Sequence, residues 1–277
     1  AGETWILLES THEFEYVTDI EIQNNNGNSI LYASVVSGVY QGEDHLSSPS
    51  DGLYRSNNFG ESWEQVLPNI NESDVPYSPS DIEITSSGKI FVGTMKNLEG
   101  DGGSTILTSL TGNQGTWSIN SDYKNLIESS NQNNIPGRVV LSSCKNEPDY
   151  IYAAIGAGFI NNIGFNLSYG EFIIKSSDSG NSWNQVNIPT EEANDWASLA
   201  WHALTISVHP ENPDIVFAAG LELYKSIDGG TSWVDLSEWD LMYSGGGDRY
   251  VHADIHQVIF KPDNLNSIAV TSDGGIF

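Results

Sequence analysis

One short stretch brings together residue types that carry out chemistry: two histidines and an aspartate alternate in His252-x-Asp254-x-His256. Side chains two residues apart on a β-strand share one face, so we expect these three to converge. They are the candidate ligand-binding residues, and they could also hold a metal ion or form an acid–base pair. A zinc site would need a further ligand that the sequence does not indicate. The alternative is a hydrogen-bonded structural cluster, because buried polar groups are normally paired in this way.

A second candidate is a pair of matching acidic segments, each reading Asp-Ile-Glu-Ile, at residues 19–22 and 81–84. Asp19 and Asp81 occupy equivalent positions, and with Asp254 they are the candidate catalytic acids. Paired carboxyl groups could hydrolyse a glycosidic bond or hold Ca²⁺. The alternative is that they form hydrogen bonds between repeats. We expect no cofactor other than this possible Ca²⁺, and the metal content stays open.

A repeated unit must position these candidates, and its plainest copy spans residues 223–233. A short strand-like run leads into Ser-Ile-Asp-Gly-Gly at residues 226–230, and Thr-Ser-Trp follows. This pattern predicts a β-hairpin whose turn aspartate accepts backbone N–H groups and whose last glycine takes a positive φ. Trp233 supplies a large apolar surface for packing against a neighbouring layer.

The same unit recurs along the chain, with a full copy at residues 174–183 and a copy at 54–63 in which Asn58 replaces the aspartate. A degraded copy ends at Trp117, and the chain opens with the tail of another at Trp5. The residues to which the pattern assigns a structural role in these turns are Ser176, Asp178, Gly180, Trp183, Ser226, Asp228, Gly230, Trp233, Asn58, Gly60 and Trp63. A unit of this kind that recurs along the whole chain indicates a propeller, a solenoid or an array.

The pattern Ser-x-Asp-x-Gly-x-Thr/Ser-Trp resembles the Asp-box, or BNR, repeat of sialidases, sortilin-type receptors and xyloglucanase-like glycoside hydrolases. The resemblance covers the whole chain. It implies an all-β fold, a β-propeller of four-stranded blades, with each box forming the turn between the third and fourth strands. We expect residues 1–277 to form a single, partial propeller domain of about four and a half blades, because both ends cut through a repeat. We therefore expect a larger propeller.

The candidate histidine stretch carries a narrower resemblance, together with Asp-Gly-Gly-Ile-Phe at residues 273–277. Both segments are similar to those of a subgroup of secreted bacterial BNR proteins. This resemblance implies an extracellular or cell-surface protein, and it suggests a cargo of type IX secretion. Sialidases are excluded, because they use three arginines on the substrate carboxylate, while this chain has only Arg55, Arg138 and Arg249, and Arg55 lies inside a box.

Composition excludes further classes of function. The chain has 37 acidic and 10 basic residues and a net charge of −27, so it would repel nucleic acid and anionic membranes. No apolar run is long enough for membrane insertion. The single Cys144 cannot form an internal disulfide, and we expect it to be a buried apolar residue.

Two functions remain open from the sequence. The first is a binding or structural module for a glycan or protein ligand, with the insertions at residues 41–51, 96–103 and 156–170 among its contact loops. The second is a glycoside hydrolase of the xyloglucanase-like type that uses paired carboxylates. In either case, we expect the remaining blades or a partner chain to cover the two ends of the array.

Overall fold

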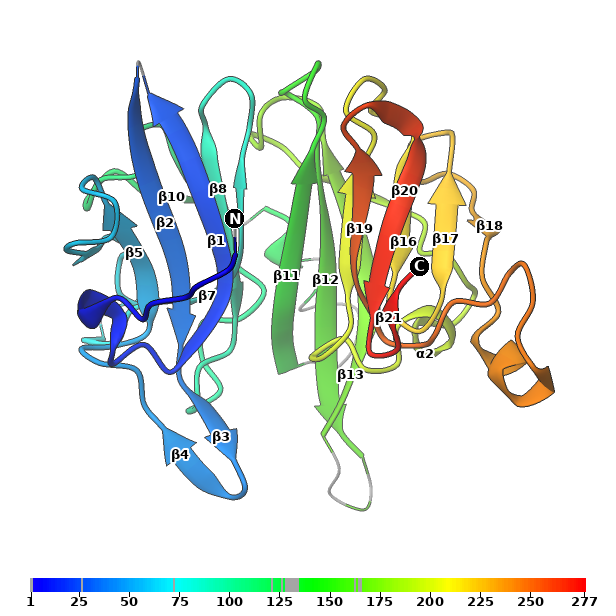
Figure 1. The fold of residues 1–277 in the computed structure, drawn as a ribbon, viewed down its shortest axis with the longest axis horizontal. Helices are drawn as coiled ribbons and strands as arrows, with labels where there is room; N and C mark the ends of the chain where they lie inside the picture. The colour runs from blue at the N-terminus through cyan, green and yellow to red at the C-terminus, as the bar shows by residue number, and fades with distance from the viewer. Residues whose placement is uncertain are drawn as a thin grey trace.

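The computed structural model describes residues 2–25, 27–71, 73–120, 122–125, 127, 135–161, 163 and 166–277. Within these residues the chain forms five consecutive antiparallel sheets, four of four strands and one of three, arranged as the blades of a β-propeller (Figure 1). The predicted all-β propeller is confirmed. The predicted four and a half blades correspond to four complete sheets and a fifth that ends after three strands.

The blades follow the order of the chain. The first two contain β1 (Tyr16–Asn25), β2 (Asn28–Val36), β5 (Gly52–Ser56) and β6 (Glu64–Gln65), then β7 (Ser78–Ile84), β8 (Ile90–Met95), β9 (Ile106–Ser109) and β10 (Ser118–Asn120). The last three contain β11 (Ile135–Ser143), β12 (Ile151–Ile160), β13 (Asn166–Ser176) and β14 (Asn184–Val186), then β15 (Thr205–Val208), β16 (Val216–Ala219), β17 (Leu223–Ser226) and β18 (Val234–Asp235), and finally β19 (Ile255–Lys261), β20 (Asn264–Ser272) and β21 (Gly275–Ile276). The connections contain the ribbon β3 (Gly38–Tyr40) and β4 (Glu43–His45), the helix α2 (Ala193–Trp196) and the 3₁₀ helices η1 (Glu9–Thr11) and η2 (Trp239–Ser244).

The first strand of each blade lies beside the first strand of the next, in the order β1, β7, β11, β15 and β19. These five strands therefore line the inner side of the array. Four of them, β1, β7, β11 and β19, have a register irregularity close to the start of the strand. Such bulges bend a strand and redirect the side chains beside them, so the residues there are placed by the fold rather than by simple alternation.

Hydrophobic residues fill the spaces between consecutive blades. Tyr32 of β2 packs with Ile90 of β8 in one cluster, while Phe91 of β8 faces the other way and packs with Ile151 of β12. Neighbouring residues of one strand thus serve opposite interfaces, as strand alternation requires. Two further clusters join the third blade to the fourth and the fourth to the fifth. Cys144 lies in the cluster between the third and fourth blades, where it is buried and free.

The repeated turns connect the third and fourth strands of their blades. In the turn at residues 176–183, the Ser176 hydroxyl accepts the Gly180 N–H at 2.8 Å, and Asp178 Oδ1 accepts the Ser182 N–H at 2.8 Å. The turn at 226–233 has the same bonds, with Gly230 and Ser232 as donors, and the turn at 56–63 has them with Asn58 as the acceptor. The turn aspartates thus satisfy backbone donors of their own hairpins.

The tryptophans that end these turns pack near the blade edges. Trp183 is buried beside Tyr123, with their ring centres 6.2 Å apart, and it joins the cluster between the second and third blades. Trp233 packs against the cluster between the third and fourth blades and donates its Nε1–H to the Asn187 carbonyl. Trp63 packs against Phe14 on the outer side of the first blade.

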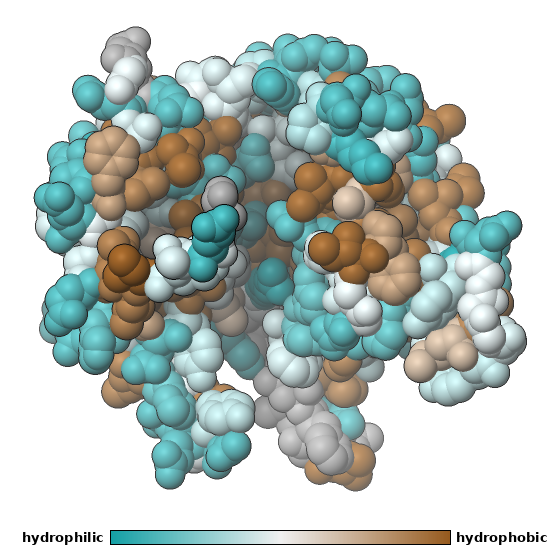
Figure 2. Space-filling model, viewed as in Figure 1, coloured by the Kyte–Doolittle hydropathy of each residue, from teal (hydrophilic) through white to brown (hydrophobic). Residues whose placement is uncertain are grey.

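Two blade faces are left open. Within the described residues β1 pairs with β2 and β21 pairs with β20, so the first and last strands of the array do not share a sheet. Ile20 and Ile22 of β1 are 62% and 53% exposed, and Ile259 and Ile276 of the fifth blade are exposed as well. Figure 2 shows hydrophobic side chains on both sides of a hollow between the first and fifth blades.

The insertions differ in structure. The segment at residues 41–51 contributes to the β3–β4 ribbon, which the sequence did not predict and which projects from the first blade (Figure 1). Much of the segment at 156–170 extends the β12–β13 hairpin, although residues 162, 164 and 165 lie outside the described part. None of the helices in the described residues is long and apolar enough to cross a bilayer.

Candidate functional site

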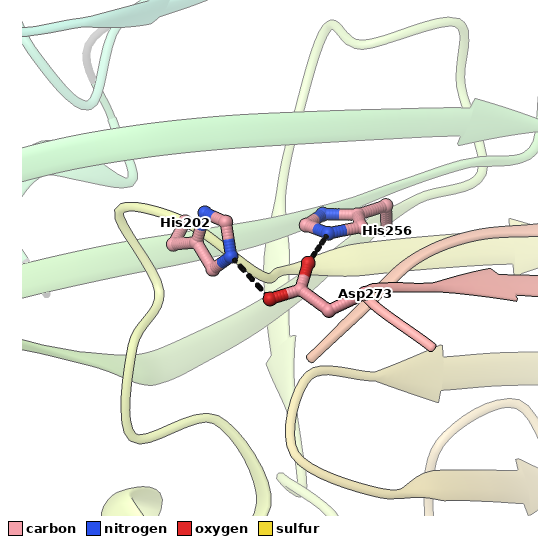
Figure 3. A group of neighbouring side chains, drawn as sticks. All are labelled: His202, His256 and Asp273. Carbon is pink, nitrogen blue, oxygen red and sulfur yellow. Dashed lines mark hydrogen bonds and ion pairs between the residues drawn. The ribbon is translucent and has the colours of Figure 1, made fainter. Parts of the chain in front are cut away.

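Three polar side chains converge on the inner side of the last two blades: His202, His256 and Asp273 (Figure 3). The Nε2 atoms of the two histidines face different oxygens of one carboxylate. His256 Nε2 lies 2.6 Å from Asp273 Oδ1, and His202 Nε2 lies 3.2 Å from Asp273 Oδ2. The imidazole rings meet edge to face, with their centres 4.9 Å apart. One aspartate therefore holds two imidazoles side by side, one on each of its oxygens.

His202 lies between α2 and β15, in a segment that is held in place by backbone bonds. The Ala200 N–H donates to the Ser168 carbonyl, and the N–H groups of His202 and Ala203 both donate to the Leu199 carbonyl. The guanidinium of Arg138, at the register irregularity of β11, donates to the His202 carbonyl at 3.1 Å. The third blade thus fixes the backbone from which His202 projects.

His256 lies at the register irregularity of β19, between Ile255 and Gln257. Its neighbour Ile255 is fully buried between the fourth and fifth blades and donates its N–H to the Gly220 carbonyl. The bulge turns His256 out of the alternation of the strand, and its ring reaches Asp273 at the turn between β20 and β21. The burial of Ile255 therefore positions His256.

The turn that carries Asp273 is held against the segment before β19. The Asp273 N–H donates to the Asp254 carbonyl at 3.2 Å. Gly274 is required there, because a Cβ atom at this position would lie 2.4 Å from the Cβ and Cγ atoms of His252. The His252 ring stays close to its own backbone, with Nδ1 2.9 Å from the Ala253 carbonyl oxygen.

The predicted convergence of His252, Asp254 and His256 on one strand face is wrong. Strand β19 begins at Ile255, so only His256 belongs to it. Asp254 has a φ of 61°, in the left-handed region, and this bend ends the two-residue alternation that the prediction assumed. His256 keeps its place in the candidate site, while His252 and Asp254 support the turn that presents Asp273.

Sequence reasoning missed His202 and Asp273 as partners of His256. The signal for Asp273 was present, because Asp-Gly-Gly at 273–275 marks a turn directly after the strand that pairs with β19. His202 gave no comparable signal, since it is 54 positions away from His256 (256 − 202) and lies before its strand.

The acidic candidates of the first two blades bind the backbone of the following blade. Asp19 Oδ2 accepts the Ile82 N–H at 2.9 Å, and Asp81 Oδ2 accepts the Leu141 N–H at 2.6 Å. Glu83 accepts the Ser143 hydroxyl at 2.5 Å. Each carboxyl group thus connects one inner strand to the next, which is the hydrogen bonding between repeats that the sequence left as an alternative.

Burial has a strong effect on these carboxyl groups. It raises the pKa of Asp81 well above the ordinary value, with a second contribution from the charge of Asp19, and it raises the pKa of Glu83 to about 7. The pKa of Asp19 is also raised by burial. The Arg138 guanidinium opposes the shift at Asp19 and Asp81 without reversing it. Asp273 behaves in the opposite way, because hydrogen bonds from His256 and then His202 lower its pKa.

An exposed aromatic side chain lies beside the histidine cluster. Trp201 is 60% exposed, and its ring centre lies 5.3 Å from that of His202. A large exposed indole next to polar groups presents one apolar face and several hydrogen-bonding atoms to a ligand. The surface formed by Trp201, His202, His256 and Asp273 is called the inner-face site below.

Comparisons with known proteins agree with the propeller. The sequence matches no protein-family model and none of the curated proteins. Among solved structures, an ancestral GH74 enzyme matches 99% of this chain and 32% of its own, with 16% identity and a TM-score of 0.56. The GH74 enzyme of Niastella koreensis matches 93% of this chain and 41% of its own, with 15% identity and a TM-score of 0.51. YCF48 bound to D1 peptide matches 93% of this chain and 61% of its own, with 17% identity and a TM-score of 0.49.

The similarities to the two GH74 enzymes show the fold and nothing finer, because the sequence identities are low. The chain spans about a third to three fifths of the lengths of these three structures. Propellers host many unrelated functions, so the activity must be argued from the site.

Proposed function

We propose that this chain is a binding propeller whose inner-face site takes a glycan. The observation that carries the proposal is the exposed Trp201 beside the His202–Asp273–His256 cluster. A sugar ring can stack its C–H face on an indole while its hydroxyl groups bond to imidazole and carboxylate atoms. The acidic candidates Asp19 and Asp81 support binding over hydrolysis, because their carboxyl groups are already used between blades.

The test is a binding measurement with a panel of soluble polysaccharides, including xyloglucan, by calorimetry and affinity electrophoresis. Wild-type protein is expected to bind at least one member, and Trp201→Ala to weaken that binding at least about tenfold, since stacking on an exposed ring is lost. Tyr243→Ala is the matched control, because Tyr243 is also exposed but lies in η2. Equal losses in both variants, or binding of proteins and no glycan, would contradict the proposal.

Glycoside hydrolysis is the second candidate function, and one observation favours it. Asp81 and Glu83 have raised pKa values, and a general acid must stay protonated near neutral pH. Release of reducing ends from any of the polysaccharides would favour this function. If Asp81→Asn then abolished the release while the thermal midpoint stayed close to that of wild type, Asp81 would be the acid.

We also propose that the protein acts outside the cell or on its surface, as a BNR-type propeller and a cargo of type IX secretion. The support is the resemblance of its repeated Ser-x-Asp-x-Gly turns, and of residues 252–256 and 273–277, to those of secreted bacterial BNR proteins. We also propose that further blades or a partner chain cover the open faces around Ile20 and Ile259, since exposed apolar faces of this kind are normally paired. Detection of the native protein in the culture supernatant or surface fraction tests the location.

A further inference from the structure

The donor atoms of the inner-face site are those of a metal centre. One nitrogen of His202, one of His256 and one carboxylate oxygen of Asp273 all lie within 4.8 Å of one another. The three residues come from the loop before β15, from β19 and from the turn after β20, so the fold assembles them from distant positions. Two imidazoles and a carboxylate form a donor set that Zn²⁺ accepts, with water in its fourth position.

The spacing suits an ion of this size. A tetrahedral Zn²⁺ lies about 2.0–2.2 Å from its nitrogen and oxygen donors, which places the donors about 3.3–3.5 Å apart. The observed separations to the Asp273 oxygens are 2.6 Å for His256 and 3.2 Å for His202. The two bonds end on different carboxylate oxygens, so the side chains must turn and move apart to place both nitrogens and one oxygen around an ion, and all three atoms already lie within 4.8 Å of one another. The Nε2 protons then move to Nδ1 or to solvent.

The surroundings favour a cation. The chain carries a net charge of −27, which raises the local concentration of positive ions. Arg138 is a positive charge close to the cluster. Its guanidinium binds the His202 carbonyl and interacts with Asp81 and Asp19, which offset its charge. The side chains of His202, His256 and Asp273 are 36%, 36% and 43% exposed, so an ion has an entry path and at least one open position.

We propose that His202, His256 and Asp273 bind one divalent transition-metal ion, with Zn²⁺ as the preferred occupant. Imidazole nitrogens favour zinc and its neighbours in the first transition row, whereas Ca²⁺ and Mg²⁺ require mostly oxygen donors. The metal site shares His202, His256 and Asp273 with the proposed glycan site, but it is defined by their donor atoms alone and does not need Trp201.

The experiment uses the full 277-residue chain after removal of metals with a chelator and dialysis. Calorimetric titration with ZnCl₂ is expected to show one ion per chain, and Co²⁺ is expected to give the visible bands of a four-coordinate site. His202→Ala and His256→Ala are each expected to weaken Zn²⁺ binding by at least about tenfold, because each removes a ligand. His12→Ala is the control, since His12 is an exposed histidine of the N-terminal segment.

A second variant separates ligation from folding. In His256→Gln the side chain can still donate to Asp273, so the fold is expected to hold in circular dichroism and thermal melting, while Zn²⁺ binding falls as in His256→Ala. The proposal would be overturned if Zn²⁺ gave no heat of binding and no Co²⁺ bands appeared with wild type. It would also be overturned if Zn²⁺ bound equally to wild type and His256→Gln, because the cluster would then be a hydrogen-bonded group alone. Binding of Ca²⁺ in preference to Zn²⁺ would overturn it too.

Discussion

The same four residues, Asp-Ile-Glu-Ile, occur within the inner strands of the first and second blades, yet their apolar side chains have opposite environments. Ile82 is 3% exposed, because the first blade covers it, whereas its counterpart Ile20 is 62% exposed. The acidic residues behave alike, since Asp19 and Asp81 each reach forward to the next blade. The contrast shows that the repeat supplies an apolar face, and that this face contributes to the free energy of unfolding only where a neighbouring blade covers it.

The sharpest test of this comparison is truncation of the two isoleucines. Ile82→Ala is expected to lower the free energy of unfolding by about 2–5 kcal/mol, because it leaves a cavity between two blades. Ile20→Ala is the matched control and is expected to cost less than about 1 kcal/mol, since its side chain already meets solvent. Chemical denaturation followed by tryptophan fluorescence measures both.

Equal costs at the two positions would contradict the comparison. That result would mean that the Ile20 face is covered in solution, and sedimentation of the same samples would then reveal the second copy that covers it.

A partly buried glutamate of the second blade, Glu83, gives a pH-dependent test. Burial raises the folded-state pKa of Glu83 from 4.5 to about 7, so the folded protein holds a proton that the unfolded chain releases. The free energy of unfolding should therefore fall as pH rises from about 4.5 to 7. In Glu83→Gln this fall is expected to shrink, by on the order of 1–3 kcal/mol across the window.

Glu21→Gln on the first blade is the control for this measurement. Burial and the charge of Asp19 raise the pKa of Glu21 as well. Glu83 is raised by burial and by two carboxyl groups of the preceding blade, Glu21 and Asp19, so we expect a smaller change for Glu21. Parallel pH profiles for wild type and Glu83→Gln would show that the pKa of Glu83 is the same in the folded and unfolded states, and they would refute the assignment.

The sequence predicted the fold in detail because its signals are local. Each Ser-x-Asp-x-Gly turn satisfies its own donors, as Asp178 and Ser182 show, and the recurrence of the turns sets the number of blades. The candidate site was only partly predicted. His256 was identified from its strand, but its partners come from the loop before the fourth blade and from a turn of the fifth blade. A positive φ at Asp254 moved two predicted members away, and no pattern of residue types encodes that bend.

The smallest expected effect on stability concerns the open face itself. The double variant Ile20→Ser with Ile22→Ser should change the free energy of unfolding by less than about 1 kcal/mol, because both side chains are more than half exposed. Its effect should appear in association.

In a propeller, the rear face of one blade packs against the forward face of the blade before it. Ile259 lies on the forward face of the fifth blade, beside the buried Val258, whose side chain faces the fourth blade. Isolated chains are therefore expected to associate head to tail as their concentration rises, and either the double variant or Ile259→Ser should reduce this in sedimentation velocity. If only the double variant reduced association, two first blades would be pairing with each other. If wild type stayed monomeric at all concentrations, the exposed isoleucines would not form a contact surface.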